Sequence, residues 1–435
     1  MAIEDLKDRV KALDATKIFF TDLNGRLMSL PVNPDHLPQI VRDGIGFDGS
    51  SIAGFATVDN SDRQLFPDPD SLRVLAFQDE TLGCLIGRIY NERGLRAATD
   101  PRAVLEKVVE RAESEYGFRF LLGPEHEFFL LSGEEFGEKG HSDQAGYFVA
   151  PPHDKGEKVR NRIISVLAKC GVEFEKAHHE VTPSQHEINL VPTTPLDAAD
   201  RTVIFNHVTY KVAREFGYFA TFMPKPFDDF NRSAFHIHLS MTDQEGHNLF
   251  YDAGRENNLS ATARQFIGGI LKYGRETSLV MASTLNSYKA YVLEKEAPVI
   301  RGWGLRNRSS MVRVPYSVNP QGTRIELRNP DPAGNPYLQM ATLIAIGLRG
   351  LEEKLDCGKP DRGSTYDQHL KLRVWDRRQL PKSLFEALVE AERSKLLPEI
   401  LGKRIYDNYM AMKMADWEEH RTHITPREHK KYLGI

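Results

Sequence analysis

Residues 123–132 read GPEHEFFLLS, and this short stretch decides the fold. Glu125 and Glu127 are two residues apart within an otherwise apolar run that begins at Phe120. A period of two is that of a β-strand, so both carboxylates are expected to project from one face of one strand. Like charges side by side on a half-buried strand repel each other and are costly to desolvate. The rest of the chain is therefore expected to supply something that compensates them.

The same mixture of acids and imidazoles within apolar strand sequence recurs in three later segments. HHEVTPSQHEI covers residues 178–188, FHIHLS covers residues 235–240 and TRIELRN covers residues 323–329. For any single strand, an acid that faces solvent is the simpler interpretation. Four such segments indicate that the strands pack together and that their carboxylates converge, where they cannot all ionise without cations. The converging carboxylates are Glu125, Glu127, Glu180, Glu187 and Glu326.

Divalent cations are the simplest compensation for such a cluster. Many oxygen ligands with a single imidazole select Mg²⁺ or Mn²⁺ over zinc, and five acids could serve two or three ions. Metal ions and guanidinium groups together neutralise a transferring phosphoryl group, so nearby arginines would indicate a nucleoside triphosphate. The sequence has no Walker A or GxGxxG motif, so metal, Arg and His would grip the phosphates. The arginines that crowd this part of the chain are Arg306, Arg308, Arg313, Arg324 and Arg328.

The composition is that of an ordinary globular protein. The chain has 435 residues, of which 40% are hydrophobic and 27% charged, and a net charge of −4. The length favours two domains, and the charge balance gives no indication of nucleic-acid or membrane-surface binding. The three cysteines form no CxxC pair, and no apolar leader or membrane-spanning run occurs. We therefore expect a cytoplasmic protein without disulfides.

The character of the sequence changes at Asp100-Pro101, an N-cap followed by proline in the first helical turn. We place a domain boundary there, between a small strand-rich domain (1–100) and a larger domain (101–435). In the first domain, Asn24-Gly25 predicts a β-hairpin, residues 72–90 predict two strands, and the glycine-rich residues 43–55 predict a loop.

The larger domain is expected to be α+β, with a mainly antiparallel sheet flanked by helices. Residues 132–146 are charged and rich in glycine, and they predict a solvated loop. The segments FRFLLGPEHEFFLL, HHEVTPSQHEINLV, FHIHLSMT and GTRIELRN are each typical of a strand. Helices are expected near 155–170, 197–216, 260–278, 335–355 and 382–398.

Over essentially its whole length the chain resembles type I glutamine synthetases. The resemblance rests on FDGSSIAGF, GPEHEFF, HHEVTPSQHEI, FMPKP followed by HIH, NSYK with EAPV, RNRSSMVRVP and RIELRNPDPAGNPYL, in the family's order. It implies an N-terminal β-grasp domain and a catalytic domain with a curved, mainly antiparallel sheet. It also implies dodecamers of two stacked hexameric rings, in which the N-terminal domain of one subunit completes the active site of the next. The implied reaction joins glutamate and ammonia at the expense of ATP, through γ-glutamyl phosphate, with Mg²⁺ or Mn²⁺.

The resemblance also implies roles for individual residues. Glu127, Glu180 and Glu187 would hold one metal ion, and Glu125, His236 and Glu326 would hold the other. His238, Arg308, Arg313, Arg324 and Arg328 would contact phosphates and the carboxylate that becomes phosphorylated, with Arg308 and Arg328 in the catalytic group. Asn231, Arg232 and Ser233 would lie beside the amino-acid substrate. Asp48 and Ser51 would form the ammonium site, and Glu296 would be the carboxylate of the flap that closes it.

The chain departs from the family pattern on the amino-acid side. The family's NGSGMH is Asn231-Arg232-Ser233-Ala234-Phe235-His236 here, so an arginine replaces a glycine. In NSYKAYVLEKEAPV, Ala290 stands where the family carries the arginine that grips the substrate's carboxylate, and Leu293-Glu294 replaces a Pro-Gly turn. The RFPD-like motif has Asn329 in place of phenylalanine.

Several functions therefore stay open at this point. Arg232 could restore the missing carboxylate contact, which would leave glutamate and ammonia as substrates. Alternatively, the chain could be a related ligase that uses another amine (an alkylamine, a polyamine or ethanolamine) or another acid. A catalytically inactive relative is a further alternative, although it would be expected to have lost metal ligands. The sequence around Tyr366 does not match the family's adenylylation site, so we expect no such modification.

Overall fold

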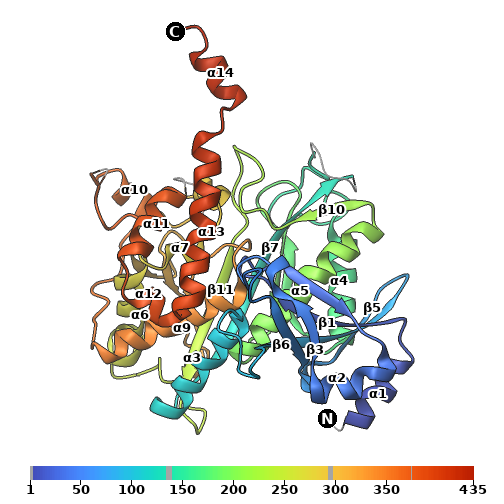
Figure 1. Cartoon of the computed structure of the whole chain (residues 1–435). Coiled ribbons are helices and arrows are strands. Elements are labelled where there is room, and N and C mark those ends of the chain that lie inside the picture. Colours follow the sequence, from blue (N-terminus) through green and yellow to red (C-terminus); the bar gives the residue numbers. More distant parts are fainter. Residues whose placement is uncertain (1–2, 134–139, 292–296, 374) are drawn as a thin grey trace.

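The structure is a computed structural model of the whole chain, and it describes residues 3–133, 140–291, 297–373 and 375–435 (Figure 1). Two features of the predicted flap, Glu296 and the Leu293-Glu294 departure, lie outside these residues. Among the described residues, none of the helices combines the length and the apolar character that crossing a membrane requires.

The N-terminal part forms a mixed sheet in the order β2-β1-β6-β4-β3, with β5 paired to β6. Its pairs are antiparallel apart from the parallel pair β1–β6. The strands are β1 (Ala15–Thr21), β2 (Leu27–Pro31), β3 (Ile45–Asp48), β4 (Asp62–Pro67), β5 (Arg73–Ala76) and β6 (Thr81–Asn91). The helices are α1 (Ile3–Lys11) and α2 (Leu37–Asp43), with short 3-10 turns at Pro34–His36, Gly49–Ser51 and Pro69–Ser71.

Most of the local expectations for this part are confirmed. The hairpin forms around Asn24-Gly25, where Gly25 takes a φ of 83° that favours glycine. The expectation that residues 43–55 form only a loop is wrong, because β3 lies within them and pairs with β4. The alternation of Ile45 and Phe47 with Gly46 and Asp48 provides the period of two that the glycines obscured.

The larger sheet has the order β12-β13-β14-β11-β7-β9-β8, with β10 paired to β7. Its described pairs are antiparallel apart from β12–β13, so the expected α+β class and mainly antiparallel sheet are confirmed. The strands are β7 (Arg119–Ser132), β8 (Phe174–His179), β9 (Gln185–Leu190), β10 (Tyr218–Thr221), β11 (Phe235–Thr242), β12 (Trp303–Leu305), β13 (Val312–Val314) and β14 (Ile325–Leu327).

The expectation that HHEVTPSQHEINLV forms one strand is wrong, because it contains the end of β8, the connecting turn and all of β9, which pair as a hairpin. The two strands are joined through Thr182-Pro183-Ser184, where Ser184 takes a φ of 65°. The hairpin places Glu187 opposite His178 on the neighbouring strand. Both halves of the motif therefore contribute side chains to the same sheet.

Along the chain, helices lie before, between and after the strands of the larger sheet. The expected start of a helix at Asp100 is confirmed, because its side chain accepts a hydrogen bond from the Arg102 backbone N–H and Gly117 ends the helix in the left-handed region. The helices are α3 (Pro101–Tyr116), α4 (Glu157–Lys169), α5 (Pro195–Glu215), α6 (Ala261–Tyr273), α7 (Ser278–Met281), α8 (Leu285–Lys289), α9 (Pro336–Glu352), α10 (Thr365–His369), α11 (Leu384–Arg393), α12 (Leu396–Leu401), α13 (Lys403–Thr422) and α14 (Pro426–Tyr432), with 3-10 turns at Glu256–Asn258 and Pro320–Gly322. Figure 1 shows α13 leading away from the sheets and α14 standing clear of the rest of the chain.

The central strand β7 packs one of its two faces against helices. Phe120 and Leu122 join an apolar cluster with α3, α6 and α9, and Phe128 and Leu130 join a second one with α4 and α5. Because side chains alternate along a strand, the acids of GPEHEFF project from the face that these helices leave uncovered. Both clusters also include N-terminal residues, so the boundary predicted near residue 100 crosses a shared core and stays a prediction.

Candidate active site

Strand register gathers the polar side chains of the larger sheet into three lines that run across it. In antiparallel sheets, residues directly opposite each other have neighbouring side chains on one face, so each line is a set of contacts. The lines are Glu127–Glu187–His178, then His236–Glu125–Asn189–Lys176, and then His238–Glu326–Arg313. Residues that are up to two hundred positions apart in the chain thus meet on one face.

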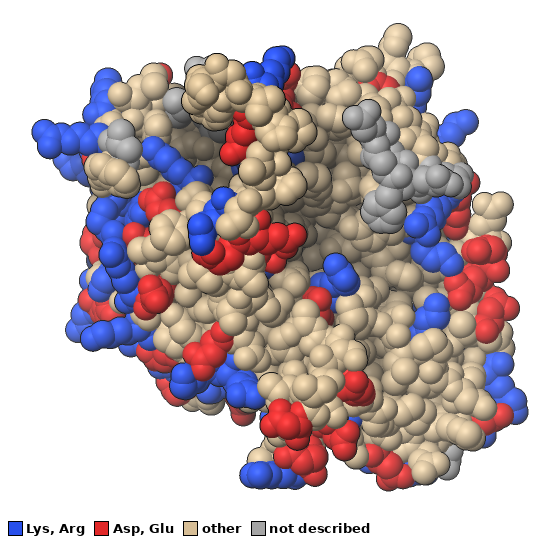
Figure 2. Space-filling view, turned by 45° about the horizontal axis from the view of Figure 1, so that its top comes forward, with Lys and Arg blue, Asp and Glu red and all other residues tan. Residues whose placement is uncertain are grey.

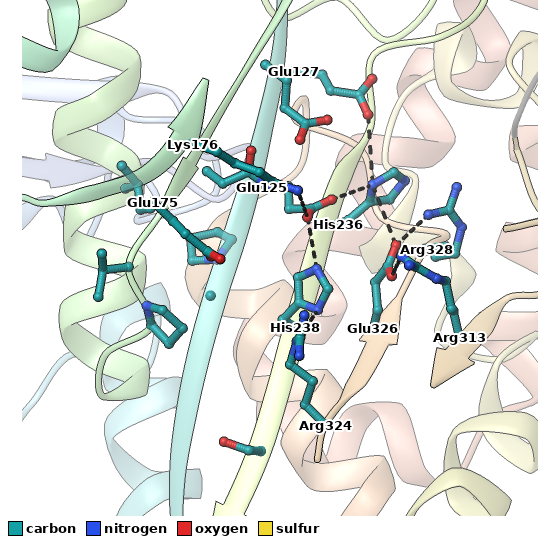
Figure 3. A pocket seen from close by; sticks show the side chains of 18 of the residues that line it. Glu125, Glu127, Glu175, Lys176, His236, His238, Arg313, Arg324, Glu326 and Arg328 are labelled. Carbon is teal, nitrogen blue, oxygen red and sulfur yellow. Dashed lines mark hydrogen bonds and ion pairs between the residues drawn. The ribbon is translucent and has the colours of Figure 1, made fainter. Parts of the chain in front are cut away.

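These lines form the floor of a cavity of about 490 Å³. The predicted residues that line it are Glu125, Glu127, Glu180, Glu187, His236, His238, Arg308, Arg313, Arg324, Glu326 and Arg328. Figure 3 shows most of them converging from β7 and β11 and from β13, β14 and the residues beside β14. The space-filling view of Figure 2 shows a hollowed face on which acidic and basic side chains are intermixed.

One group of possible metal ligands consists of Glu125, His236 and Glu326. Glu125 Oε2 lies 3.1 Å from His236 Nδ1, and His236 Nδ1 lies 3.9 Å from Glu326 Oε1. Burial opposes ionisation of Glu326, but the charge of Arg328 and the attraction of the neighbouring histidines together outweigh it and lower the pKa to about 2. Burial and the charge of Arg328 lower the pKa of His236 to about 4. This group is therefore an ionised carboxylate pair around a neutral imidazole, which suits a cation.

His238 is oriented by its neighbours. Arg324 Nε donates a hydrogen bond to His238 Nδ1 at 3.1 Å, so the proton of the neutral imidazole lies on Nε2. Nε2 lies 2.9 Å from Glu125 Oε1 and donates to it. Although burial opposes its ionisation, the electrostatic interaction with His238, followed by hydrogen bonds from His236 and His238, keeps the pKa of Glu125 well below its usual value. Glu125 thus carries its charge at neutral pH.

The second predicted set is Glu127, Glu180 and Glu187, all of them buried; in the structure Glu180 and Glu187 group as possible metal ligands with His178, and Glu127 lies directly opposite Glu187. Burial, followed by the charge of Glu180, raises the pKa of Glu127 to about 8. Burial, followed by the charges of Glu125 and Glu127, raises the pKa of Glu187 well above its usual value. Burial also acts on Glu180, but His178 Nε2, 2.8 Å from its Oε1, lowers that pKa. Divalent cations fit this set, because they would remove the repulsion and the donors are carboxylate oxygens.

Arginine side chains complete one wall of the cavity. Arg313 and Arg328 both donate to Glu326, whose side chain is fully buried. Arg328 also donates from Nε to the backbone oxygen of Arg308 at 3.0 Å. TRIELRN supplies Arg324 and Arg328 from positions that flank β14, which itself covers only Ile325–Leu327. This wall therefore presents positive charge beside the Glu125 group.

The residues predicted to lie beside the amino-acid substrate are not part of the lining of this cavity. Asn231, Arg232 and Ser233 are not among the lining residues, and Arg232 is 3% exposed. Its guanidinium donates to the backbone oxygens of Arg328 and Asn329 and lies over the ring of Tyr291, 5.4 Å from the centroid. Ala290, which precedes Tyr291, is buried as well. The Arg232 guanidinium thus contacts the backbone of Arg328 and Asn329.

Asp48 and Ser51 also lie apart from the cavity, on the N-terminal sheet. Both are exposed, and Ser51 Oγ donates to Asp48 Oδ2 at 2.9 Å. Hydrogen bonds from Ser50, together with the one from Ser51, lower the pKa of Asp48. Within the single chain these two residues are not brought to the metal-ligand groups.

The residues that line the cavity and received no role from the sequence include Tyr147, Lys176, His178 and Asn189. Tyr147 directly follows the segment 132–146, which the sequence predicts to be a solvated loop, and its ring packs edge-on against His178 with centroids 5.2 Å apart. Lys176 and Asn189 could have been found by extending the period of two from His178 and Glu187 along their strands.

Comparison with known proteins matches both parts of the chain to one family. Residues 13–92 match a family model described as "Glutamine synthetase, beta-Grasp domain", and residues 98–432 match one described as "Glutamine synthetase, catalytic domain". Curated proteins named "Glutamine synthetase" are 38% identical in Methanosarcina mazei (99% of this chain, 98% of the relative) and 39% identical in Mycobacterium tuberculosis (96% of each).

Solved structures give the same result. "GmaS/ADP complex-Conformation 1" has a TM-score of 0.89 at 29% identity, covering 99% of this chain and 100% of that one. A Plasmodium falciparum glutamine synthetase, at 21% identity, shares the fold with a TM-score of 0.87 and covers 99% of this chain and 98% of its own. With both parts of the chain matched and full-length relatives above 35% identity, this protein belongs to the glutamine synthetase family.

Proposed function

We propose that this protein is an ATP-dependent ligase that joins glutamate and ammonia to form glutamine. The observation that carries the proposal is one cavity that combines two groups of buried carboxylates and imidazoles with an arginine wall, in a chain of the glutamine synthetase family. In the proposed reaction, the γ-carboxylate of glutamate attacks the terminal phosphorus of ATP and ADP leaves. Ammonia then attacks the acyl carbon of γ-glutamyl phosphate, phosphate leaves with the bonding electrons, and a proton is lost from nitrogen.

The metal sites are assigned to the two groups of acids. Glu127, Glu180 and Glu187 would hold one ion, and Glu125, His236 and Glu326 would hold another; the resemblance implies two ions, and five acids could serve two or three. Bound Mg²⁺ or Mn²⁺ supplies charge neutralisation for the phosphates and for the carboxylate that they meet. The specific ion is part of the proposal.

The residues around the ions have separate tasks. Arg308, Arg313, Arg324 and Arg328 would present guanidinium groups to the phosphates and to the phosphorylated carboxylate. His238, held between Arg324 and Glu125, would contact the β-phosphate region. Arg313 and His238 lie on strands of the sheet, Arg324 and Arg328 flank β14, and Arg308 lies in the turn before β13, so the sheet positions most of these groups before the substrates arrive.

The amine side would be completed by a second subunit. Asp48 and Ser51 are exposed and lie away from the cavity of their own chain, which supports their delivery to the cavity of a neighbour. There Asp48 would attract ammonium and take its proton, and Glu296 would close the flap. We propose the dodecamer of two hexameric rings that the family resemblance implies, and the cytoplasmic location that the sequence composition favours.

A related ligase with another acid or amine is the second candidate. It is favoured by Ala290, which carries no charge, and by Arg232, whose guanidinium donates to the backbone oxygens of Arg328 and Asn329. Neither position offers a charged group to the cavity for the substrate's second carboxylate. A catalytically inactive relative is disfavoured, because all six proposed metal ligands line one cavity.

The proposal is tested by phosphate release and product mass spectrometry with ATP and Mg²⁺. Glutamate with ammonium is compared with glutamate plus ethylamine, putrescine or ethanolamine, and with other dicarboxylic and amino acids plus ammonium. We expect the highest kcat/KM for glutamate and ammonium, with glutamine as product. A larger kcat/KM for another pair would establish the second candidate, and no amide from any pair would overturn both.

A further inference from the structure

The line of side chains that starts at His236 and Glu125 continues beyond the two metal-ligand groups to Asn189 and Lys176. Lys176 lines the cavity with 54% of its side chain exposed. Its Nζ lies 3.8 Å from Glu125 Oε1. The lysine therefore adds a half-exposed cation on β8, on the side of the cavity opposite the arginine wall of β13 and β14 (Figure 3).

The ion pair with Glu125 does not by itself explain the position of Lys176. Both oxygens of Glu125 already have closer partners, because His238 Nε2 lies 2.9 Å from Oε1 and His236 Nδ1 lies 3.1 Å from Oε2. A half-exposed ion pair at 3.8 Å is weak and restrains a lysine little. An ammonium group has three N–H donors, and this geometry leaves them available for a ligand in the cavity.

Asn189 provides the second observation. It is 3% exposed and lines the same cavity, and its Oδ1 is buried without a hydrogen-bond partner among the described residues. Buried acceptors are normally paired, and an unpaired one costs about 1–3 kcal/mol. Lys176 stands directly opposite Asn189 in the β8–β9 pairing. One N–H of the ammonium group can therefore pair with Oδ1 while the others point into the cavity.

We propose that Lys176 binds the terminal phosphates of the nucleoside triphosphate, with Asn189 Oδ1 fixing its ammonium group. Phosphate is the anion that suits this position, because Arg324 approaches the Glu125–His238 pair from the other side. Phosphate oxygens between Lys176 and Arg324 would receive charged donors from β8 and from beside β14. The inference deepens the proposed function and rests on it for the identity of the nucleotide.

The test compares Lys176→Ala and Lys176→Arg with Lys169→Ala, which removes an exposed lysine of α4 outside the cavity. Calorimetric titration with ADP and with adenosine, both with Mg²⁺, measures binding without turnover. For Lys176→Ala we expect ADP affinity to fall about tenfold or more, as for loss of a charged hydrogen bond, and adenosine affinity to stay unchanged. Lys176→Arg should restore most of the ADP affinity, and Lys169→Ala should match the wild type.

Two further readouts separate this role from others. In steady-state assays Lys176→Ala should raise KM for ATP and leave KM for glutamate unchanged. Mn²⁺ binding without nucleotide should also be unchanged. Unaltered ADP binding, or a loss of Mn²⁺ binding with no effect on ADP, would overturn the inference and leave Lys176 as a partner of Glu125. If the wild type binds ADP through Lys176 but forms no amide, the proposed ligase function fails and the phosphate contact stands.

Discussion

Glu127 and Glu187 face each other directly on the neighbouring antiparallel strands β7 and β9, and both are buried. Opposed like charges destabilise a sheet, and burial makes their ionisation costly. The pKa of each is raised, first by burial and then by other carboxylates. This pair shows that the fold keeps two opposed, buried carboxylates at a position where a bound cation would remove their repulsion.

The first prediction follows from that conflict. In a chelator, Glu187→Gln should unfold about 1–3 °C above the wild type, because the substitution removes an uncompensated buried acid. With Mg²⁺ the order should reverse, because the wild type gains stability from metal binding and the variant gains less. Thermal unfolding with and without Mg²⁺ measures both effects. Glu110→Gln, at an exposed position of α3, is the control and should follow the wild type; a variant less stable than the wild type in chelator would contradict the prediction.

Arg232 provides the second prediction. Its guanidinium donates to the backbone oxygens of Arg328 and Asn329, so Arg232→Ala leaves these buried acceptors without that donor. We expect a loss of about 1–3 kcal/mol in the free energy of unfolding, with KM for glutamate within about threefold of the wild type. Urea unfolding and steady-state kinetics check the two parts. A large rise in KM for glutamate with unchanged stability would instead support Arg232 as the replacement for the family's carboxylate-binding arginine.

Much of this site could be predicted from the sequence, and the successes share one physical basis. The period of two in GPEHEFF and FHIHLS fixes which side chains share a strand face, and that face is the cavity floor. Which strands neighbour one another is not encoded in spacing, so the convergence of Glu326 with Glu125 was a hypothesis until the sheet order was seen.

The failures also have identifiable causes. A long side chain can adopt several rotamers from one backbone position. The sequence around Arg232 therefore does not reveal that its guanidinium binds the backbone oxygen of Arg328. Pro183 and Ser184 break what was interpreted as one strand, because a turn there requires a positive φ that the residue types did not signal. Helix α13 was not predicted, since its apolar residues do not follow a clear helical period.

The third prediction concerns acid stability and involves His207. Its ring lies edge-on to Phe19 and Phe77, with centroids 5.2 Å and 5.9 Å away. Burial, followed by the charges of Lys17 and Lys211, lowers the pKa of His207 to about 4. The unfolded chain then binds the proton more readily between about pH 6.5 and pH 4, so stability should fall as pH drops through that window.

Urea unfolding across this pH range tests the role of His207. Between about pH 6.5 and pH 4, His207→Gln should lose less free energy of unfolding than the wild type, by on the order of 2 kcal/mol. Its plot of stability against pH should therefore be shallower. His247→Gln, at a side chain that is 75% exposed, should keep the slope of the wild type. Equal slopes in all three proteins would exclude the contribution assigned to His207.

The fourth prediction concerns the buried ion pair between Arg102 and Asp200. Arg102 Nη2 and Nε donate to the two oxygens of Asp200 at 2.9 Å and 3.1 Å, and Tyr337 Oη donates to the same carboxylate at 2.7 Å. Arg102→Ala would leave a buried carboxylate without its cation, and we expect a loss of about 3–5 kcal/mol. Arg119→Ala breaks an exposed pair with Glu113 and should cost less than about 1 kcal/mol. Chemical unfolding measures the difference, and equal losses would refute the distinction.

Direct measurement of metal binding tests the central claim, that acids from separate strands share divalent cations in one cavity. The free Mn²⁺ signal in electron paramagnetic resonance is followed as protein is added, for the wild type and for Glu127→Gln and Glu326→Gln. The wild type is predicted to bind two or three ions per chain, and each variant is predicted to lose one of them or bind it much more weakly. A wild-type chain that leaves the free Mn²⁺ signal unchanged, or variants that bind as the wild type does, would contradict the account.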